Sequence, residues 1–271
     1  MLLGGFDGLH LGHRQLLACA KESGFAVGLM TIVGCKEGNN LFTFSEREEI
    51  FQNAGADFVF ELPFGKIKDL SPKAFLDLLD QKFSPKLYVC GEDFRFGAKA
   101  AGTPKIIEQT THVRVETLPL VEVDGEKVSS SYVKTLLKDG KMERVNELLT
   151  HPFFLMGRVY PDRKIGRTLG FPTANILYPK EKFPLKIGVY ETRICVDGTF
   201  YRGITNYGAR PTFEDETVVT ETYLDGFDGD LYGKELKIEF IRFLRDVQKF
   251  DGVDGLKRQL EEDIERVRKH D

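Results

Sequence analysis

Residues 166–175 combine two glycines, a basic side chain, a proline and two small oxygen-bearing side chains in the stretch GRTLGFPTAN. The glycines let the backbone turn and approach a ligand closely, and Arg167 adds positive charge, so the stretch suits a loop that closes over a phosphate. Pro172 stiffens the end of this loop, where Thr173 and Asn175 offer neutral oxygens of the kind that Mg²⁺ accepts beside ATP phosphates. A plain surface turn is the common alternative, but few turns need both a rigid and a coordinating half.

A second candidate site lies at the amino end, where residues 4–13 read GGFDGLHLGH, after a short expected strand and before a helical pattern over residues 13–21. Such a glycine-rich turn makes an anion site, because unpaired backbone N–H groups and the helix dipole face the ligand. His10 and His13 point the same way on a helical turn and could donate hydrogen bonds to a triphosphate as pyrophosphate leaves. The pair could also be a surface or metal-binding accident, but its place after the first strand favours phosphate chemistry. We predict phosphate contacts at Gly4, Phe6 and Gly12.

Two further segments are candidates for the same amino-terminal site. Residues 127–134, KVSSSYVK, precede an expected helix, so their serines could cap it and bind phosphate, although such a cluster alone is usually only a cap. Residues 91–97, GEDFRFG, follow the apolar run 87–90 and so lie at the carboxyl end of a strand, where open α/β sheets bind ligands. The aromatic pair in this segment could instead belong to the core.

The composition limits the kind of protein. With 271 residues, 41% hydrophobic and 30% charged, the chain is typical of a globular protein with two domains. A net charge of −4 argues against wrapping nucleic acid as the main task, whereas small anionic ligands need only a local positive cradle. No signal peptide or membrane span is expected, and four cysteines without a CxxC pair favour a reducing compartment, so we expect a cytoplasmic protein.

The first half of the chain alternates apolar runs with helical patterns, which predicts a parallel, doubly wound α/β sheet. Helix starts are indicated by a capping box of Ser45 and Glu48 and by the helix-opening prolines Pro72 and Pro104. A helix ends near Gly140 and another follows it. The expected strands, all taken as buried on both faces, cover residues 25–33, 58–62, 87–91 and 113–118.

His151-Pro152 breaks this pattern, and we place the domain boundary there, with one domain at residues 1–150 and the other at 151–271. Beyond it, short alternating strands such as residues 190–196 and 236–241 predict a small antiparallel barrel or sandwich. The tail over residues 253–269 has helical spacing and should pack on that barrel.

These motifs together resemble a known family. The HxGH stretch at residues 10–13 resembles that of the nucleotidyltransferase superfamily, and residues 166–175 resemble the ATP/Mg loop of riboflavin kinases, with its PTAN core intact. In this order they look like the bifunctional bacterial riboflavin kinase/FAD synthetase (FMN adenylyltransferase) family, over essentially the whole chain. The resemblance implies a Rossmann-like nucleotidyltransferase domain, followed by a β-barrel kinase domain with a C-terminal helix. It also implies that riboflavin and ATP give FMN in the carboxyl half, and that FMN and ATP give FAD and pyrophosphate in the amino half, with Mg²⁺ in both steps.

The resemblance also implies roles for single residues. Glu221 is the expected base for the kinase step, because its distance from the DLYG stretch at residues 230–233 equals that in riboflavin kinases, although a lone Glu in a strand usually just points outward. His10 and His13 are the expected catalytic residues of adenylyl transfer. The other expected contacts are Ser130, Ser131, Lys134, Gly166, Arg167 and Thr168 with ATP or phosphate, Asp93, Phe94, Asn206 and Arg210 with flavin, and Thr173 and Asn175 with Mg²⁺.

Two departures from the family pattern fall in the amino half. Residues 33–38 read VGCKEG where members usually carry a Pro-His-Pro-like stretch, and the helix-start motif ends in Lys134, which lacks the planar two-pronged grip of arginine on phosphate. The alternative function is therefore a riboflavin kinase with a weakened adenylyltransferase domain. A non-catalytic flavin- or nucleotide-binding protein is a third hypothesis, disfavoured because binding alone needs neither a base nor the histidine pair. A cytidylyltransferase would not explain the PTAN segment.

Overall fold

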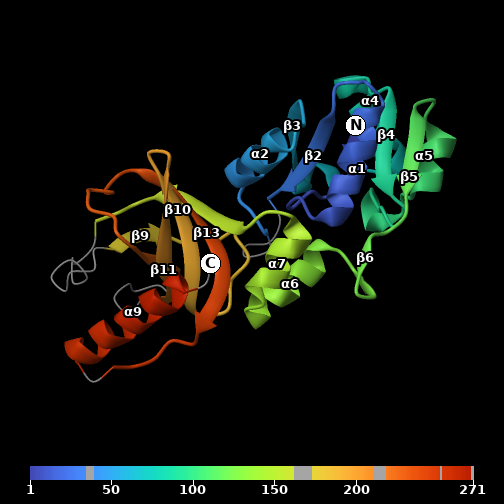
Figure 1. Ribbon diagram of the computed structural model, residues 1–271. Coiled ribbons are helices and arrows are strands. Elements are labelled where there is room, and N and C mark those ends of the chain that lie inside the picture. The colour runs from blue at the N-terminus through green and yellow to red at the C-terminus, as the bar shows by residue number, and fades with distance from the viewer. Residues whose placement is uncertain (35–39, 162–172, 210–217, 251, 270–271) are drawn as a thin grey trace. The chain divides into compact units, whose positions relative to one another are not determined.

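The computed structural model describes residues 1–34, 40–161, 173–209, 218–250 and 252–269, and it divides into two compact units. Figure 1 colours the chain from its first residue to its last, so that the segments of each unit can be followed. Unit 1 consists of Met1–Val133, Leu148–Thr150 and Glu181–Phe183, and unit 2 consists of Lys134–Glu147, His151–Lys180 and Pro184–Asp271.

Unit 1 contains a five-stranded parallel sheet in the order β3-β2-β1-β4-β5 (Figure 1). Its strands are β1 (Leu2–Leu3), β2 (Gly28–Val33), β3 (Phe58–Pro63), β4 (Leu87–Gly91) and β5 (Arg114–Leu118). Its helices are α1 (Leu11–Glu22), α2 (Phe44–Asn53), α3 (Phe64–Ile67), α4 (Pro72–Phe83), the 3₁₀ turn η1 (Ala98–Ala100) and α5 (Pro104–Thr110). The predicted doubly wound α/β sheet is confirmed. The strand order reverses between β1 and β4, and ligands bind outside the carboxyl ends of strands at such a point.

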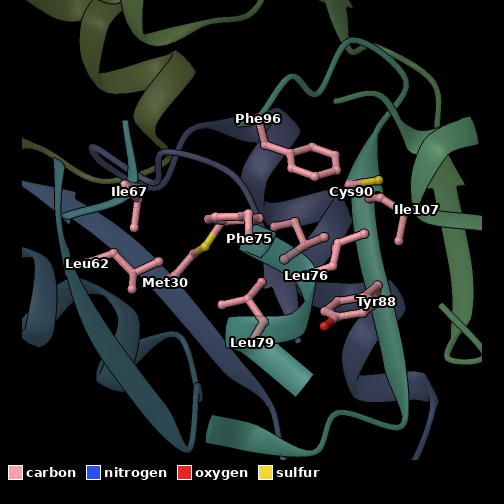
Figure 2. Close-up of a cluster of buried hydrophobic side chains, with 11 residues drawn as sticks. Met30, Leu62, Ile67, Phe75, Leu76, Leu79, Tyr88, Cys90, Phe96 and Ile107 are labelled. Carbon is pink, nitrogen blue, oxygen red and sulfur yellow. The ribbon is translucent and has the colours of Figure 1, made fainter. Parts of the chain in front are cut away.

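Right-handed crossovers place α1 and α2 on one face of this sheet and α4 and α5 on the other. Figure 2 shows the core on the second face, where side chains of the helices meet those of the strands. The labelled members of this cluster are Met30, Leu62, Ile67, Phe75, Leu76, Leu79, Tyr88, Cys90, Phe96 and Ile107. This packing fixes the ends of β1 and β4, from which the candidate phosphate loop and the GEDFRFG segment emerge.

Three of the predicted strands differ from the structure. β2 begins only at Gly28, and Phe25 is 55% exposed. β3 and β5 are the two edges of the sheet and are not buried on both faces, as the 54% exposure of Phe58 shows. Helices cover the middle of a sheet better than its rims, so apolar runs at the edges keep part of their surface in water.

The predicted capping box of α2 is wrong by two residues. The Thr43 hydroxyl accepts a hydrogen bond from the N–H of Glu46 at 3.4 Å, and the Glu46 carboxylate accepts one from the N–H of Thr43 at 2.8 Å. Ser45 lies inside the first turn instead. The earlier pair is used because Leu41 and Phe42, just before it, are fully buried and fix how the chain enters the helix. The prolines Pro72 and Pro104 open α4 and α5 as predicted.

The chain between the two sheets is short and mostly helical. A hairpin of β6 (Glu122–Val123) and β7 (Glu126–Lys127) leads into α6 (Ser130–Asp139) and α7 (Met142–Leu149). Gly140, at φ 73°, ends α6 as predicted. The first four residues of α6 belong to unit 1 and the rest to unit 2.

Unit 2 contains a six-stranded antiparallel sheet in the order β8-β13-β10-β11-β12-β9 (Figure 1). The strands are β8 (Phe153–Arg158), β9 (Thr173–Leu177), β10 (Gly188–Val196), β11 (Thr199–Ala209), β12 (Val218–Leu224) and β13 (Glu235–Arg245). Beyond β8, the N–H of Tyr160 donates to the carbonyl of Asn175 in β9 at 3.0 Å, so the sheet curls until its two end strands meet. The predicted barrel is confirmed.

The C-terminal helix α9 (Val253–Arg268) packs on this barrel as predicted. Ile264 and Val267 join a cluster with Val189, Ile204 and Leu244 of the strands. Within the described residues, the structure has no helix that is both long and apolar enough to cross a membrane.

Candidate active sites

The loop between β1 and α1 carries both candidate histidines of unit 1. Phe6, at φ 39°, turns the chain, and its ring is buried and packs edge-on against Phe51 at 6.0 Å between centroids. The predicted phosphate contact of Phe6 can therefore come only from its main chain. His10 is the N-cap of α1, and its ring stacks on that of His13 with centroids 3.6 Å apart.

Hydrogen bonds assign the tautomers of both imidazoles. Nδ1 of His10 accepts from the N–H of His13 at 3.3 Å, so a neutral His10 carries its proton on Nε2. Nδ1 of His13 lies 2.5 Å from the carbonyl oxygen of Gly8, which can only accept, so His13 carries its proton on Nδ1. His10 thus offers a donor at Nε2, whereas Nε2 of a neutral His13 is an acceptor.

Burial keeps both imidazoles neutral. It lowers the pKa of His10 to about 2, and the charges of His13 and Lys127 lower that pKa further. Burial also lowers the pKa of His13 to about 4, although the hydrogen bond to Gly8 and the charge of Asp93 oppose the shift. Neutral rings can stack without repulsion. An arriving polyphosphate would raise both pKa values, so the pair can take up a proton as the anion binds.

Two glycines of this loop, Gly4 and Gly12, leave space for neighbouring rings. A Cβ on Gly12 would lie 3.3 Å from the His10 ring, and one on Gly4 would lie 2.9 Å from the Phe6 ring. Glycine at these positions leaves room for the two rings, and a phosphate contact at either position stays a prediction.

Two other predicted segments come close to the histidines. Lys127 and Asp93 form an ion pair, and their charges act on the pKa values of His10 and His13, so the segments after β4 and before α6 reach the same end of the sheet as the histidine loop. Phe94, in contrast, stacks on Phe96 at 5.3 Å between centroids and packs against the core. Asp93 is thus brought to the candidate site, and Phe94 lies partly in the core.

The serine cluster divides between a cap and a first helical turn. Ser129 caps α6, with its Oγ accepting from the N–H of Tyr132 at 3.2 Å. Ser130 and Ser131 open the helix, where the backbone N–H groups point out of its end and suit an anion. Lys134 is half-buried and belongs to unit 2.

In unit 2, candidate residues from three neighbouring strands form one row. Glu221 of β12 pairs directly with Asn206 of β11 and with Asn175 of β9. Directly paired residues of antiparallel strands share a face of the sheet. Thr173, also in β9, donates from Oγ1 to Oε1 of Glu221 at 3.0 Å. One carboxylate and three neutral oxygen-bearing side chains therefore gather on one face.

Hydrogen bonds on the opposite face hold this row in register. The hydroxyls of Thr205 and Thr222, both fully buried, lie 2.8 Å apart and join β11 to β12. Thr220 donates to the carbonyl of Ile176 at 3.1 Å, which joins β12 to β9. A slip of one residue would move Glu221 to the other face, so these bonds fix the site.

Of the predicted site residues, Gly166, Arg167, Thr168 and Arg210 lie outside the described residues. Sequence reasoning missed a buried charged pair in unit 1, Glu46 with Lys182. Glu46 could have been found from the T-x-x-E spacing of the capping box. Lys182, 136 residues further along the chain, gives no local signal.

Comparison with known proteins decides the family. An FAD synthetase family model matches residues 1–132, and a riboflavin kinase family model matches residues 149–270. A bifunctional riboflavin kinase/FMN adenylyltransferase of Bacillus subtilis is 34% identical, over 97% of this chain and 89% of the relative. The chain belongs to the bifunctional riboflavin kinase/FMN adenylyltransferase family. It is therefore a transferase.

Other relatives match this chain over almost its whole length. Proteins of the same name from Listeria monocytogenes and Mycoplasma pneumoniae are 32% and 31% identical, each over 99% of this chain and over 91% and 96% of their own lengths. A crystal structure from Streptococcus pneumoniae, of a protein named a macrolide-efflux protein, matches with a TM-score of 0.87 and 27% identity over 98% of this chain and 92% of that one. The efflux name belongs to that protein, and both domains of the family are present in this chain.

Proposed function

We propose that this chain makes flavin cofactors in two steps. Unit 2 would phosphorylate riboflavin with ATP to give FMN, and unit 1 would transfer the adenylyl group of a second ATP to FMN, giving FAD and pyrophosphate. The observation that carries this proposal is that each unit gathers the groups for one transfer. In unit 2, the carboxylate of Glu221 accepts a hydrogen bond from Thr173 and lies opposite Asn175. In unit 1, two neutral histidines stack at the point where the strand order reverses.

In the kinase step, Glu221 accepts the proton of the riboflavin hydroxyl that attacks the γ-phosphorus of ATP. The new O–P bond forms as the bond to the bridging oxygen breaks, and ADP leaves. Thr173 orients the carboxylate by donating to it. Because the Thr173 hydroxyl donates its hydrogen bond to Glu221, the lone pairs of the Thr173 oxygen remain available to a cation. The side-chain oxygen of Asn175 is a hard ligand of the same kind, so the two residues fit Mg²⁺. When bound, Mg²⁺ would neutralise charge on the phosphates.

In the adenylyl step, a phosphate oxygen of FMN attacks the α-phosphorus of ATP and pyrophosphate leaves. His10 donates from Nε2 to a phosphate oxygen, as its tautomer allows. His13 takes up a proton as the triphosphate arrives and then donates from Nε2, which stabilises charge that grows on the leaving group. Lys127 is paired with Asp93 beside them and adds a positive charge to this end of the sheet.

The setting of both reactions is also part of the proposal. We assign the adenylyltransferase to residues 1–150 and the kinase to residues 151–271, a division supported by family-model matches that end at residue 132 and begin at residue 149. Partners are riboflavin, FMN and ATP, without nucleic acid or membrane. The spaced cysteines support a cytoplasmic location.

Product analysis tests this proposal. Riboflavin with ATP and Mg²⁺ should give FMN and then FAD, and FMN with ATP should give FAD and pyrophosphate. His10→Ala and His13→Ala should lower FAD formation by about 10²-fold or more, the usual worth of such a group, and leave FMN formation nearly intact. His112→Ala, at an exposed histidine, is the matched control. If FMN yields no FAD with the wild-type chain, only the kinase remains, and if riboflavin yields neither product, the proposal fails.

A further inference from the structure

Unit 1 contains a buried ion pair that the proposed reactions do not use. Nζ of Lys182 lies 2.5 Å from Oε2 of Glu46, and both side chains are 0% exposed. Burial lowers the pKa of Lys182, whereas the carboxylates of Glu46 and Asp7 raise it. Taking two charges out of water is costly, and a well-packed apolar pair often serves stability as well, so stability alone does not explain this pair.

The segment that carries Lys182 is firmly seated in unit 1. Glu181–Phe183 belongs to unit 1, although the chain on either side of it belongs to unit 2. The N–H of Asn40 donates to the carbonyl of Glu181 at 3.1 Å, and the N–H of Phe183 donates to the carbonyl of Asn40 at 2.6 Å. Two backbone hydrogen bonds therefore determine where the lysine enters.

Contacts lead from Lys182 to the candidate histidines. Its ammonium lies 4.5 Å from the ring centroid of Phe42. The Phe42 ring packs so tightly on Gly8 that a Cβ there would lie 3.1 Å from it. The carbonyl of Gly8 in turn accepts the hydrogen bond from Nδ1 of His13 at 2.5 Å.

A second set of contacts reaches the same turn. Asp7, next to Gly8, accepts a hydrogen bond from the N–H of Leu41 at 2.8 Å, and its charge acts on Lys182. Glu46 is itself tied to the start of α2 through the N–H of Thr43. The ammonium thus lies among three groups that bound the glycine turn, namely Asp7, Phe42 and the start of α2.

We propose that Lys182 is a positioning residue for adenylyl transfer. By holding Phe42 and Asp7 against the glycine turn, it keeps the Gly8 carbonyl where that oxygen sets the tautomer and orientation of His13. The inference rests on the proposed function of this loop. It adds to the adenylyltransferase a residue from beyond the proposed boundary at residue 150.

The test uses the full chain with Lys182→Met, which keeps the apolar stem and removes the ammonium. The rate of FAD formation from FMN should fall about 10- to 100-fold, mainly in kcat. A displacement of a reacting group by ~1 Å can lower the rate by up to about 100-fold. FMN formation from riboflavin in the same preparation should stay near the wild-type value. Imidazole ¹⁵N spectra should show His13 losing its Nδ1–H form. Lys180→Met, at an exposed lysine nearby, should change neither the activities nor the spectra.

A second variant keeps the test decisive if Lys182→Met fails to fold. Lys182→Met with Glu46→Gln removes both charges of the buried pair together and keeps a side-chain oxygen for the N–H of Thr43. Wild-type FAD formation with unchanged His13 signals in this folded variant would overturn the inference, and so would an equal loss of both activities. A wild-type chain that makes no FAD from FMN would instead refute the adenylyltransferase part of the proposed function, and the His13 spectra would then still test whether Lys182 positions His13.

Discussion

The hydroxyl of Thr173 and the carboxylate of Glu221 form a hydrogen-bonded pair in which each side chain orients the other. The bond runs from Thr173 Oγ1 to Glu221 Oε1 over 3.0 Å and joins β9 to β12. A carboxylate has about four acceptor positions, so this bond uses only part of its capacity. Glutamine at this position would keep an oxygen for Thr173 and would lose the ability to take a proton.

Glu221→Gln therefore separates binding from turnover. FMN formation from riboflavin should fall about 10²- to 10⁴-fold, the usual worth of a general base. Riboflavin binding by flavin fluorescence and the denaturation midpoint should stay close to wild type, and so should FAD formation from FMN. Glu235→Gln, at an exposed glutamate of β13, is the matched control. Undiminished FMN formation in Glu221→Gln would mean that another group takes the proton.

The histidine pair shows which properties of a site can be predicted from residue spacing and which cannot. The three-residue spacing of His10 and His13 predicts that they point the same way, and their rings do stack. The tautomers could not be predicted, because they depend on the position of the Gly8 carbonyl in the folded turn. The lowered pKa values depend on burial, which a local pattern does not contain.

Whole elements were predictable in type, but not always in position. The apolar runs at residues 58–62 and 113–118 are strands, yet which strands form the edges of a sheet depends on long-range pairing. The T-x-x-E and S-x-x-E patterns at Thr43 and Ser45 are equivalent locally, and burial of the residues before Thr43 selects the first. Family resemblance predicted Glu221 as the kinase base from its distance to the DLYG stretch, and only the register shows it opposite Asn175.

Asn146 shows how one side chain can hold elements of unit 2 together. From α7, its Nδ2 donates to the carbonyls of Phe240 at 2.9 Å and Ile241 at 3.3 Å, and its Oδ1 accepts from the N–H of Phe153 at 2.8 Å. Asn146 therefore ties the helix to both β13 and β8, which lie next to each other in the barrel.

Asn146→Asp should weaken this connection without changing the size of the side chain. A carboxylate accepts from Phe153 as before, but it has no proton for the two carbonyls, and it repels them. Losing these donors should lower the free energy of unfolding of unit 2 by about 2–4 kcal/mol. Urea denaturation followed by NMR signals of unit 2 measures the change, with Glu143→Gln, at an exposed position of α7, as the control. Equal stability of Asn146→Asp and wild type would show that these bonds contribute little.

At the scale of the whole molecule, the order of a parallel α/β sheet and a barrel was predictable from the change of texture at residue 151. The position of Glu181–Phe183 in unit 1 could not be predicted from the sequence. This segment comes from the second half of the chain and joins unit 1 through two backbone hydrogen bonds and one buried ion pair. Nothing in the residues around Lys182 distinguishes it from a surface lysine. Only its partner Glu46, 136 residues earlier in the chain, explains its burial.

The stability of unit 1 should depend on pH through its histidines. Their folded pKa values of about 2 and about 4 lie below the ordinary value of 6.5, so the unfolded chain binds protons that the folded chain does not. The contribution of the two histidines to the free energy of unfolding is therefore fully present above pH 6.5. It is lost as the pH falls toward 4, by at most about 1.4 kcal/mol per pH unit for each imidazole. Urea titrations followed by NMR signals of unit 1, at about pH 7 and about pH 5, measure this loss. His13→Gln removes one titrating group, so its loss over the same interval should be smaller, whereas the loss in His112→Ala should match wild type. Carboxylates titrate in all these chains alike, so an identical loss in wild type and His13→Gln would mean that the His13 imidazole binds protons equally well folded and unfolded.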